Sequence, residues 1–456
     1  MLAVSSLAAF LAFLDVTIVN IAFPAIAAEF PQSSPADLSW IFTAYNVTFA
    51  ALLVPAGRLA DLWGRRRVFL VGLALFGIAS AVCAAAPTVG LLVAGRTAQA
   101  LAAALLAPSS LALLLPVFPA ERLGFAVGTW GAMGGIAAAT GPALGGLVVD
   151  VLGWRAVFLL NLPVVALTLV AATLVITESR ERGARLPDLA GVLLLGVGVA
   201  LLAWGIVGGE TSWTSPATLA RLVGGLGLLA VFAWRNARVA TPLVEPALFR
   251  VLAFRAAIVG YLVFSAAFYA LLLANVLFLT GVWHYAVLTA GLAVTPGPLM
   301  AATASAVGGR LADRFGARAV LVPGALLFAT GCALFAAGMG GDPAYLTHFL
   351  PATLLTGTGV GAVFSGLGVA TVAALPPNRY ATGSAVGTCA RQIGAVFGIS
   401  ALLSGLAAGG EFRTAWVLMA LAALVTAAVG GTVGRVCAAP PRLVPAPAAA
   451  TIGETS

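Results

Sequence analysis

Long apolar segments alternate with short polar connections along the whole chain. A membrane-spanning helix needs about 20 mostly apolar residues. Runs such as 68–86 and 191–208 approach that length without the two-residue alternation of a barrel strand. Breaks at proline, glycine and charge give fourteen segments: 2–26, 36–60, 66–86, 89–115, 123–149, 154–177, 189–209, 216–236, 252–280, 286–309, 318–340, 343–371, 380–404 and 413–436. The pattern predicts an all-α integral membrane protein with fourteen transmembrane helices.

Composition agrees with a lipid environment. Hydrophobic residues make up 61% of the chain, charged residues 8%, and the mean hydropathy is +1.09. The net charge of +8 falls on no soluble basic patch, so we expect no nucleic-acid partner. The chain shows neither a metal-ligand nor a nucleophile constellation. We therefore expect no metal, no cofactor and no enzyme activity, with a membrane enzyme as the alternative class.

The arginines indicate how the chain crosses the membrane. All 23 basic residues are arginine, and short cytoplasmic loops are enriched in basic residues. With a cytoplasmic N-terminus, only Arg155 and Arg413 fall outside, and Arg96, Arg221 and Arg391 fall within spans. We expect a multi-pass protein of the cell membrane with both termini in the cytoplasm.

Two internal repeats divide the chain. Gly57, Arg58, Asp61, Gly64 and Arg66 return 252 residues later as Gly309, Arg310, Asp313, Gly316 and Arg318, and the sequence GFAVGT at 124–129 returns as GSAVGT at 383–388. The repeats predict two six-helix bundles, residues 1–177 and 245–436. Residues 178–244 form a cytoplasmic linker and a two-helix insert, which we expect at the periphery. Residues 437–456 form a disordered cytoplasmic tail.

Several motifs, in order along the chain, resemble one transporter family. GRLADLWGRRR (57–67) resembles the loop signature of the major facilitator superfamily. FLAFLDVTIVNIAFPAI (10–26), AGRTAQALAAALLAP (94–108), ATGPALGG (139–146), WRAVFLLNLP (154–163) and TGSAVGTCARQIGAVFG (382–398) are similar to motifs of its fourteen-span drug:proton antiporters. One departure is Ala137, where the family's helix-five motif begins with glycine.

The resemblance implies a function. It implies a monomeric antiporter in the lipid bilayer that exports small amphipathic or hydrophobic molecules, such as drugs and antibiotics, against protons by alternating access. A dedicated exporter or a proton-coupled importer of an endogenous metabolite is the alternative.

Asp15 is the one carboxylate clearly inside an apolar segment. It lies about thirteen residues, or roughly 20 Å, from the start of its span. A charge there is costly unless it is paired, hydrated or protonated, so a change in exposure or partner can load and unload a proton. Arg96, about eight residues into its own span, can hold a fixed positive charge beside it. A structural carboxylate paired with Asn20 or Arg96 is the alternative.

The repeated loops predict a conformational latch. A carboxylate beside arginines at a helix end can pair across the two bundles when they meet on the cytoplasmic side, and separate when they part. The residues assigned to this latch are Gly57, Arg58, Asp61, Gly64, Arg65, Arg66, Asp313 and Arg314. Setting the membrane topology is a second role for the arginines, and it does not explain the aspartates.

Small residues in the fifth segment predict close helix contact. Gly141, Pro142, Gly145 and Gly146 thin the helix and permit a bend. The resemblance adds that this antiporter motif seals the protein against leak. Polar and aromatic residues inside spans are the candidates for the substrate pathway: Asn20, Tyr45, Asn46, Gln99, Trp130, Asn275, Arg391 and Gln392. A purely structural role for Arg391 stays open.

The first segment begins at Leu2 without a cytoplasmic leader, so the natural start can lie upstream. A signal peptide over residues 1–30 is the alternative. It is disfavoured because the segment lacks basic residues at its start and carries Asp15 and Asn20 within its apolar run.

Overall fold

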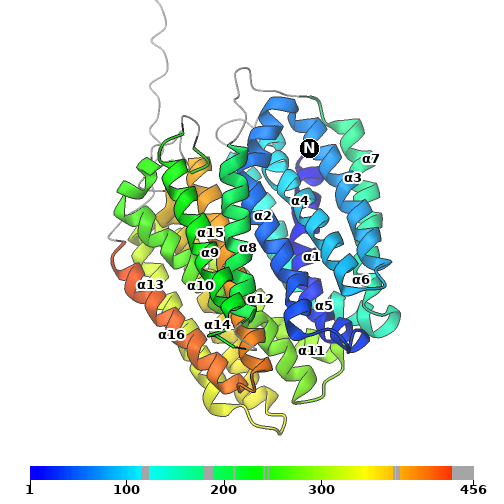
Figure 1. Ribbon diagram of the computed structural model, residues 1–456, viewed down its shortest axis with the longest axis vertical. Coiled ribbons are helices and arrows are strands. Elements are labelled where there is room, and N and C mark those ends of the chain that lie inside the picture. The colour runs from blue at the N-terminus through cyan, green and yellow to red at the C-terminus, as the bar shows by residue number, and fades with distance from the viewer. Residues whose placement is uncertain are drawn as a thin grey trace, which may run out of the picture.

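Helices are the only regular secondary structure in the part of the chain that the computed structural model describes (Figure 1). The described residues are 1–114, 123–178, 188–208, 212–239, 242–244, 246–372, 375 and 380–433. Within these ranges the structure does not describe the side chains of residues 9, 54, 58, 61, 111, 123–132, 135, 138, 313, 372 and 380–382.

Each of the fourteen predicted segments coincides with one helix or with two consecutive helices. The first half contains α1 (Leu2–Glu29), α2 (Pro35–Trp63), α3 (Arg65–Ala84), α4 (Val89–Leu114), α5 (Leu123–Leu152), α6 (Arg155–Leu159) and α7 (Asn161–Val175). The insert contains α8 (Leu189–Gly208) and α9 (Pro216–Asn236). The second half contains η3 (Pro246–Arg250), α10 (Leu252–Gly281), α11 (Val287–Val294), α12 (Pro296–Phe315), α13 (Ala317–Gly338), η4 (Tyr345–Phe349), α14 (Leu350–Val372), α15 (Tyr380–Ala407) and α16 (Phe412–Gly431).

Twelve of the helical segments in the described ranges are long and apolar enough to cross a membrane. They do not include α2 and α5, although these helices are 29 and 30 residues long. Fourteen spans therefore remain a prediction. The last helix also ends at Gly431 and not at 436, because two glycines and Thr432 weaken the helix there.

Two tight turns in corresponding places show why the repeated glycines recur. Gly64 joins α2 to α3 with a φ of 107°, and Gly316 joins α12 to α13 with a φ of 89°. A residue with a side chain is strained in this region of backbone space, so glycine is required. The two positions are equivalent in the repeats. We call the end of the molecule that carries both turns the arginine-rich end.

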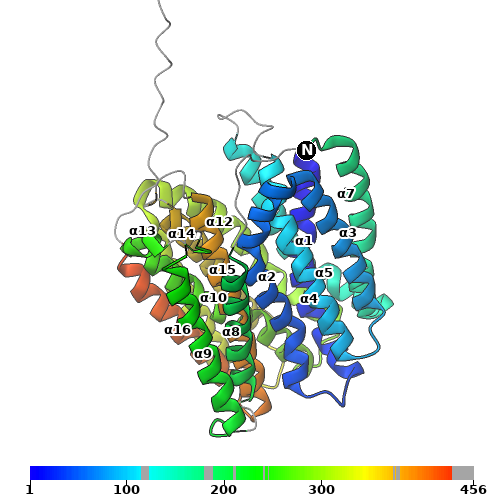
Figure 2. The same ribbon diagram turned by 45° about the horizontal axis from the view of Figure 1, so that its top comes forward.

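The helices form two bundles that lie side by side (Figures 1 and 2). In the first bundle α1 packs on α5, and α4 packs on α2 and α3. In the second, α10 packs on α15, and α14 packs on α12 and α13. The bundles meet where α2 contacts α15 and where α5 contacts α11.

The insert is only partly peripheral. α9 packs mainly on α8, while α8 lies along the junction of the bundles and contacts both α2 and α15. There Val199 and Ala203 pack with Val47 of α2 and Val396 of α15. Our expectation of a peripheral insert is wrong for α8, because its apolar face is wide enough to cover both neighbours.

An ion pair joins the two insert helices at the arginine-rich end. Arg235 at the end of α9 donates to Asp188 just before α8, through Nε at 3.0 Å and Nη2 at 2.8 Å. The hydrogen bonds from Arg235 hold the pKa of Asp188 below its usual range.

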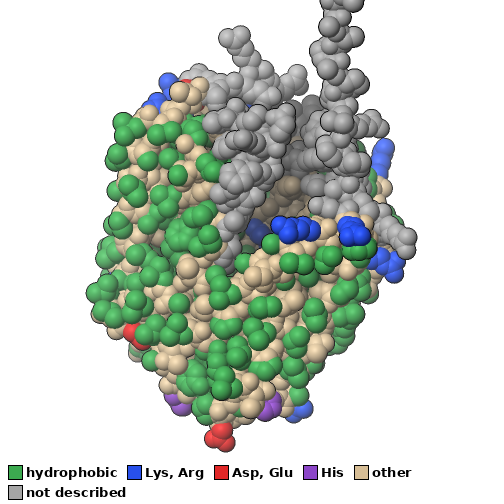
Figure 3. Space-filling view, turned by 180° about the vertical axis from the view of Figure 1, so that it is seen from behind, with side chains coloured by type: hydrophobic (Ala, Val, Ile, Leu, Met, Phe, Trp, Pro, Cys, Tyr) green, Lys and Arg blue, Asp and Glu red, His purple; other side chains and the backbone are tan. Residues whose placement is uncertain are grey.

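Among the described residues, the hydrophobic cores join the bundles chiefly at one end. One continuous core includes the second bundle and reaches Ile18–Ile26 of α1, Leu38–Phe42 of α2 and Val149–Phe158 of the first. The remainder of the first bundle, toward the arginine-rich end, has a second core that includes Leu53, Phe69 and Leu113 and reaches the second bundle at Cys389 of α15. Figure 3 shows a flank covered by hydrophobic side chains, with most of the visible arginines toward the upper, arginine-rich end.

Close backbone contact joins the bundles at the opposite end. A Cβ at Gly146 of α5 would lie 2.7 Å from Cα of Leu288, and one at Gly291 of α11 would overlap the carbonyl oxygen of Pro142. The amide of Leu288 also donates to Asp150 Oδ2 at 3.1 Å. On another face of α5, Gly141 and Gly145 lie against Thr17 and Ile18 of α1. The predicted close packing is confirmed, and α5 uses it toward both neighbours.

We predict that Gly291→Ala weakens the closure at this end. The added methyl group forces α5 and α11 apart, at a cost of about 1–2 kcal/mol, which changes the closed-to-open ratio roughly five- to thirty-fold. Labelling of a single cysteine at Asp150 by a membrane-impermeant reagent should rise accordingly. Gly281→Ala is the matched control, because a Cβ there meets nothing within 4 Å. Equal labelling of the two variants would contradict this description of the junction.

Candidate functional site

Asp15 is fully buried near the middle of α1, with 0% of its surface exposed. Its Oδ2 accepts a hydrogen bond from Arg96 Nη1 of α4 at 2.5 Å. Its Oδ1 accepts from Gln99 Nε2 at 3.2 Å and from Asn161 Nδ2 of α7 at 3.1 Å. The carboxylate is thus held by one cation and two amides, and Asn20 takes no part, because its Nδ2 donates to the Val16 carbonyl.

Arg96 is as buried as its partner, with 1% of its surface exposed. Besides Asp15, its Nη1 donates to Gln99 Oε1 at 2.8 Å and its Nε donates to the Ile41 carbonyl of α2 at 3.3 Å. The guanidinium lies 4.3 Å from the ring centroid of Tyr45, a distance at which the ring face attracts a cation. Helices α1, α2 and α4 are therefore bound to one another through this side chain.

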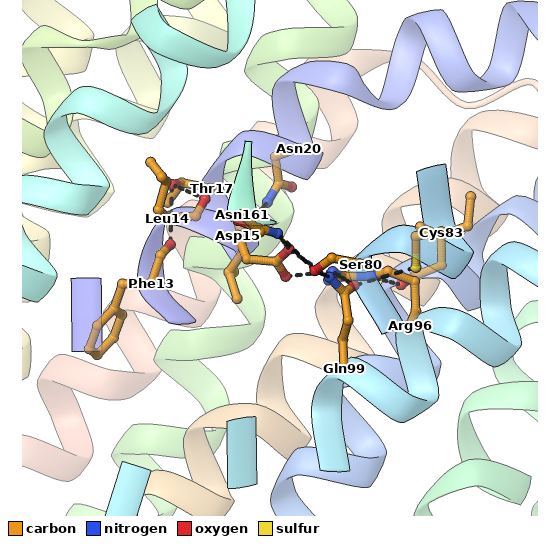
Figure 4. A network of polar contacts seen from close by, with 12 residues as sticks. Phe13, Leu14, Asp15, Thr17, Asn20, Ser80, Cys83, Arg96, Gln99 and Asn161 are labelled. Carbon is orange, nitrogen blue, oxygen red and sulfur yellow. Dashed lines mark hydrogen bonds and ion pairs between the residues drawn. The ribbon is translucent and has the colours of Figure 1, made fainter. Parts of the chain in front are cut away.

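Ser80 and Cys83 hold the amide side chains that contact Asp15 (Figure 4). Ser80 Oγ of α3 accepts from Gln99 Nε2 at 2.8 Å and from Asn161 Nδ2 at 3.2 Å. Cys83 Sγ donates to Gln99 Oε1 at 3.5 Å. Gln99, expected in the substrate pathway, lies inside this network with no exposed surface.

The pair carries no net charge, and that is why it can be buried. Breaking a buried ion pair by removing one partner costs about 3–5 kcal/mol, because the other charge is left uncompensated. Loss of the carboxylate charge by protonation removes the same attraction while the hydrogen-bonding side chains remain. A proton on Asp15 is therefore expected to loosen the contacts that Arg96 makes with α1.

The remaining pathway candidates fall into three groups. Asn20, Asn46 and Gln392 are buried, and each has a side-chain oxygen without a hydrogen-bond partner. Asn275 lies within the second bundle, where its Oδ1 accepts from Trp416 Nε1 at 3.3 Å. The side chain of Trp130 lies outside the described residues.

Arg391 is partly exposed, and its guanidinium lies 5.9 Å from the ring centroid of Phe364. Its Nε is buried without a hydrogen-bond partner.

The latch candidates that the structure describes contact residues of their own bundle. Arg65 Nη1 donates to the Ala112 carbonyl of α4 at 3.4 Å, and Arg66 Nη2 donates to the Thr173 carbonyl of α7 at 3.0 Å. A Cβ at Gly57 would lie in ordinary contact with Pro108, 3.5 Å away. Arg314 is exposed and lies over the ring of Phe315. The side chains of Arg58, Asp61 and Asp313 lie outside the described residues.

Sequence reasoning missed three contributors. Ser80 and Asn161 complete the shell around Asp15, and Glu178 accepts from the Arg66 amide at 3.1 Å and lies beside Gly64. Asn161 stood in an apolar run, and that was a usable signal, because an amide in a span needs a partner. Ser80 gave none, since serine is tolerated on any helix face.

The fold and the buried ion pair define a helical membrane transporter built of two bundles. A family model described as Major Facilitator Superfamily matches residues 5–297 and 257–450. The chain belongs to the Major Facilitator Superfamily.

Curated relatives cover most of the chain. This chain is 34% identical over 406 residues to "Multidrug resistance protein Stp" of Mycobacterium tuberculosis, and the match covers 89% of this chain and 75% of that protein. It is 35% identical over 399 residues to "Puromycin resistance protein pur8" of Streptomyces alboniger, covering 86% and 78%.

Solved structures share the fold at low identity. A transporter of the POT family has a TM-score of 0.70 at 16% identity, covering 94% of both chains. A bacterial homologue of the lysosomal transporter Spinster, described as inward-facing and unoccupied, has a TM-score of 0.67 at 17% identity, covering 95% of this chain and 96% of that one.

Proposed function

We propose that the protein exports small amphipathic or hydrophobic molecules, drugs and antibiotics among them, in exchange for protons. The observation that carries the proposal is the fully buried Asp15–Arg96 pair, which joins helices of one bundle inside the membrane. Burying an ionisable pair at this depth costs free energy, so such a pair indicates a functional site. Its charge state also depends on how far it is exposed. The relatives named for multidrug and puromycin resistance support both the direction of transport, which is export, and drugs as the substrate.

The proton step follows from the geometry. With the carboxylate charged, Arg96 binds α1 to α2 and α4. Protonation of Asp15 removes the charge attraction and frees the guanidinium, which can then stay with Tyr45 and the Ile41 carbonyl. Alternating access requires such a two-state element, whose equilibrium a bound proton or substrate can shift.

We propose fourteen spans, with α2 and α5 added to the twelve that meet the length and hydropathy criteria. The positive-inside rule then places the arginine-rich end and both termini in the cytoplasm. Across the described ranges, the bundles share one core at the opposite end, whereas the other core of the first bundle reaches the second only at Cys389; this supports a conformation open to the cytoplasm. The two six-helix bundles, residues 1–177 and 245–436, move as the alternating units, and the protein works as a monomer.

The latch and the seal act at opposite ends in this scheme. Asp61 and Asp313, with the arginines beside them, stabilise the conformation in which the cytoplasmic ends meet. Gly141, Pro142, Gly145 and Gly146 let α5 close against α1 and α11 on the outside, and this closure limits leak. Asn20, Asn46, Arg391 and Gln392 offer polar groups to the substrate between the bundles, and Tyr45 adds an aromatic ring that also contacts Arg96.

We predict that Asp15→Asn abolishes export driven by a pH gradient in proteoliposomes. Asparagine keeps the hydrogen-bonding shape but cannot exchange a proton, and it leaves Arg96 uncompensated, so the yield should fall as well. Size-exclusion chromatography identifies the folded fraction that is assayed. Glu29→Gln on the same helix is the control, because Glu29 pairs with Arg155 at a half-exposed site. Uphill pumping by folded Asp15→Asn at the wild-type rate would refute the proton assignment.

We also predict that Asp61→Asn raises the population open at the arginine-rich end. The aspartate stabilises only the conformation in which that end is closed, so its loss shifts the ratio by about 1–2 kcal/mol, or five- to thirty-fold. Cysteine labelling from the cytoplasmic side should increase. Asp342→Asn, an exposed acid at the opposite end, should leave the labelling unchanged. If Asp61→Asn alters neither labelling nor transport, the arginine motif serves topology alone.

A further inference from the structure

A cluster of aromatic rings surrounds Arg391 in the second bundle. Tyr261 of α10 stacks on Phe364 of α14, with ring centroids 6.1 Å apart and planes at 24°. Phe268 of α10 meets the same Phe364 ring edge-on at 5.5 Å. Arg391 of α15 lies with its guanidinium carbon 5.9 Å from the Phe364 centroid. Three helices thus bring three rings and one cation together within the membrane span.

The cluster is not completely buried. Tyr261, Phe268, Phe364 and Arg391 are each partly exposed, whereas Phe264 behind them is completely buried. Glycine permits the arrangement, because a Cβ at Gly387, one turn before Arg391, would lie 3.0 Å from Tyr261 Cε2.

Neighbouring residues of α15 show which way Arg391 points. Cys389 Sγ donates to the Ala50 carbonyl of α2 at 3.1 Å, and Gly394 lies against Leu262 of α10. Arg391 is two residues from Cys389 and is therefore turned by about 200° from the α2 contact. It lies on the same face of α15 as Gly387 and Gly398, which pack against Tyr261 and Ala266 of α10. Gln392 beside it is buried, and its Oε1 has no partner.

No described acidic residue compensates Arg391. The buried carboxylate in the described spans, Asp15, is already paired with Arg96. The Nε of Arg391 is buried and unpartnered, and its guanidinium faces the ring of Phe364. A guanidinium with free donors in a site of low polarity attracts an anion strongly and repels a cation.

We infer that Arg391, Tyr261, Phe268 and Phe364 form the substrate site, and that its preferred substrates are planar aromatic molecules bearing an acidic, anionic group. The inference rests on the proposed export function and specifies its substrate class. The rings take the aromatic part, and the Arg391 guanidinium takes the anionic group, with Gln392 as a neighbouring polar partner. A cationic drug of the same shape meets an uncompensated positive charge.

Three probes of one shape and different charge test the inference on the purified full-length protein. They are a naphthalenesulfonate, a naphthyltrimethylammonium and the neutral naphthamide, and the charges of the first two do not change with pH. Equilibrium binding should show the sulfonate bound at least about tenfold more tightly than the ammonium. Equal binding of the two, or a preference for the cation, would overturn the inference whatever the variants do.

Variants then assign the preference to one side chain. Arg391→Gln should lower the ratio of sulfonate to naphthamide affinity about tenfold, and Arg391→Lys should keep part of it, since the charge stays but the planar donors are lost. Arg413→Gln makes the same substitution at an exposed site and should leave the ratio at its wild-type value. A wild-type ratio in Arg391→Gln that still binds naphthamide would also overturn the inference.

Transport measurements separate this inference from the export proposal. If a pH gradient drives naphthamide out but the protein shows no charge preference, the substrate class is wrong and export stands. If the charge preference is present in binding but no gradient drives any probe, the site stands and proton-coupled export fails.

Discussion

The ion pair between Asp15 and Arg96 is the interaction on which the first bundle depends. Two charges with almost no exposed surface are tolerable only because each neutralises the other and the amides of Gln99 and Asn161 complete their hydrogen bonds. The contacts reach α1, α2, α4 and α7, and Ser80 adds α3. A change in the charge of one carboxylate is therefore felt by five helices at once.

Because small residues bring the two bundles close together at one end of the molecule, a change in the charge of Asp15 acts differently on the two ends. At the end opposite the arginines, glycines of α5 and α11 allow backbone to touch backbone, and one hydrophobic core runs through both bundles. Toward the arginine-rich end, the described core of the first bundle reaches the second bundle only at Cys389. Loosening of α1 within the first bundle acts on α5, because Gly141 and Gly145 lie directly against α1. The buried charge and the glycine-lined junction are thus mechanically connected through one helix pair.

Much of the architecture was predictable because lipid imposes strong constraints on a sequence. Every predicted segment is helical, since the backbone must be satisfied internally wherever apolar runs are long. The burial of Asp15 and its pairing with Arg96 followed from the cost of a lone charge. The position of α8 between the bundles did not follow, because an apolar helix face does not reveal whether it meets lipid or protein.

The candidate site was harder to predict than the fold. Polar residues in spans were recognisable, but Gln99 and Asn275 turned out to serve internal contacts, and periodicity cannot separate these from a pathway. The aromatic cluster around Arg391 also escaped notice, since Phe264, Phe268 and Phe364 read as ordinary core residues. These rings lie beside Arg391 because α10, α14 and α15 come together in the fold, and the sequence alone does not show this contact.

We propose that Asp15 changes its protonation state as the protein changes conformation. Infrared difference spectroscopy on the purified protein, comparing substrate-bound with substrate-free samples at several pH values, observes the carboxyl group directly. The account predicts a band of a protonated carboxylic acid that grows or vanishes with substrate and is missing from Asp15→Asn. A transport-competent protein whose difference spectrum shows no Asp15-dependent band at any pH would contradict it.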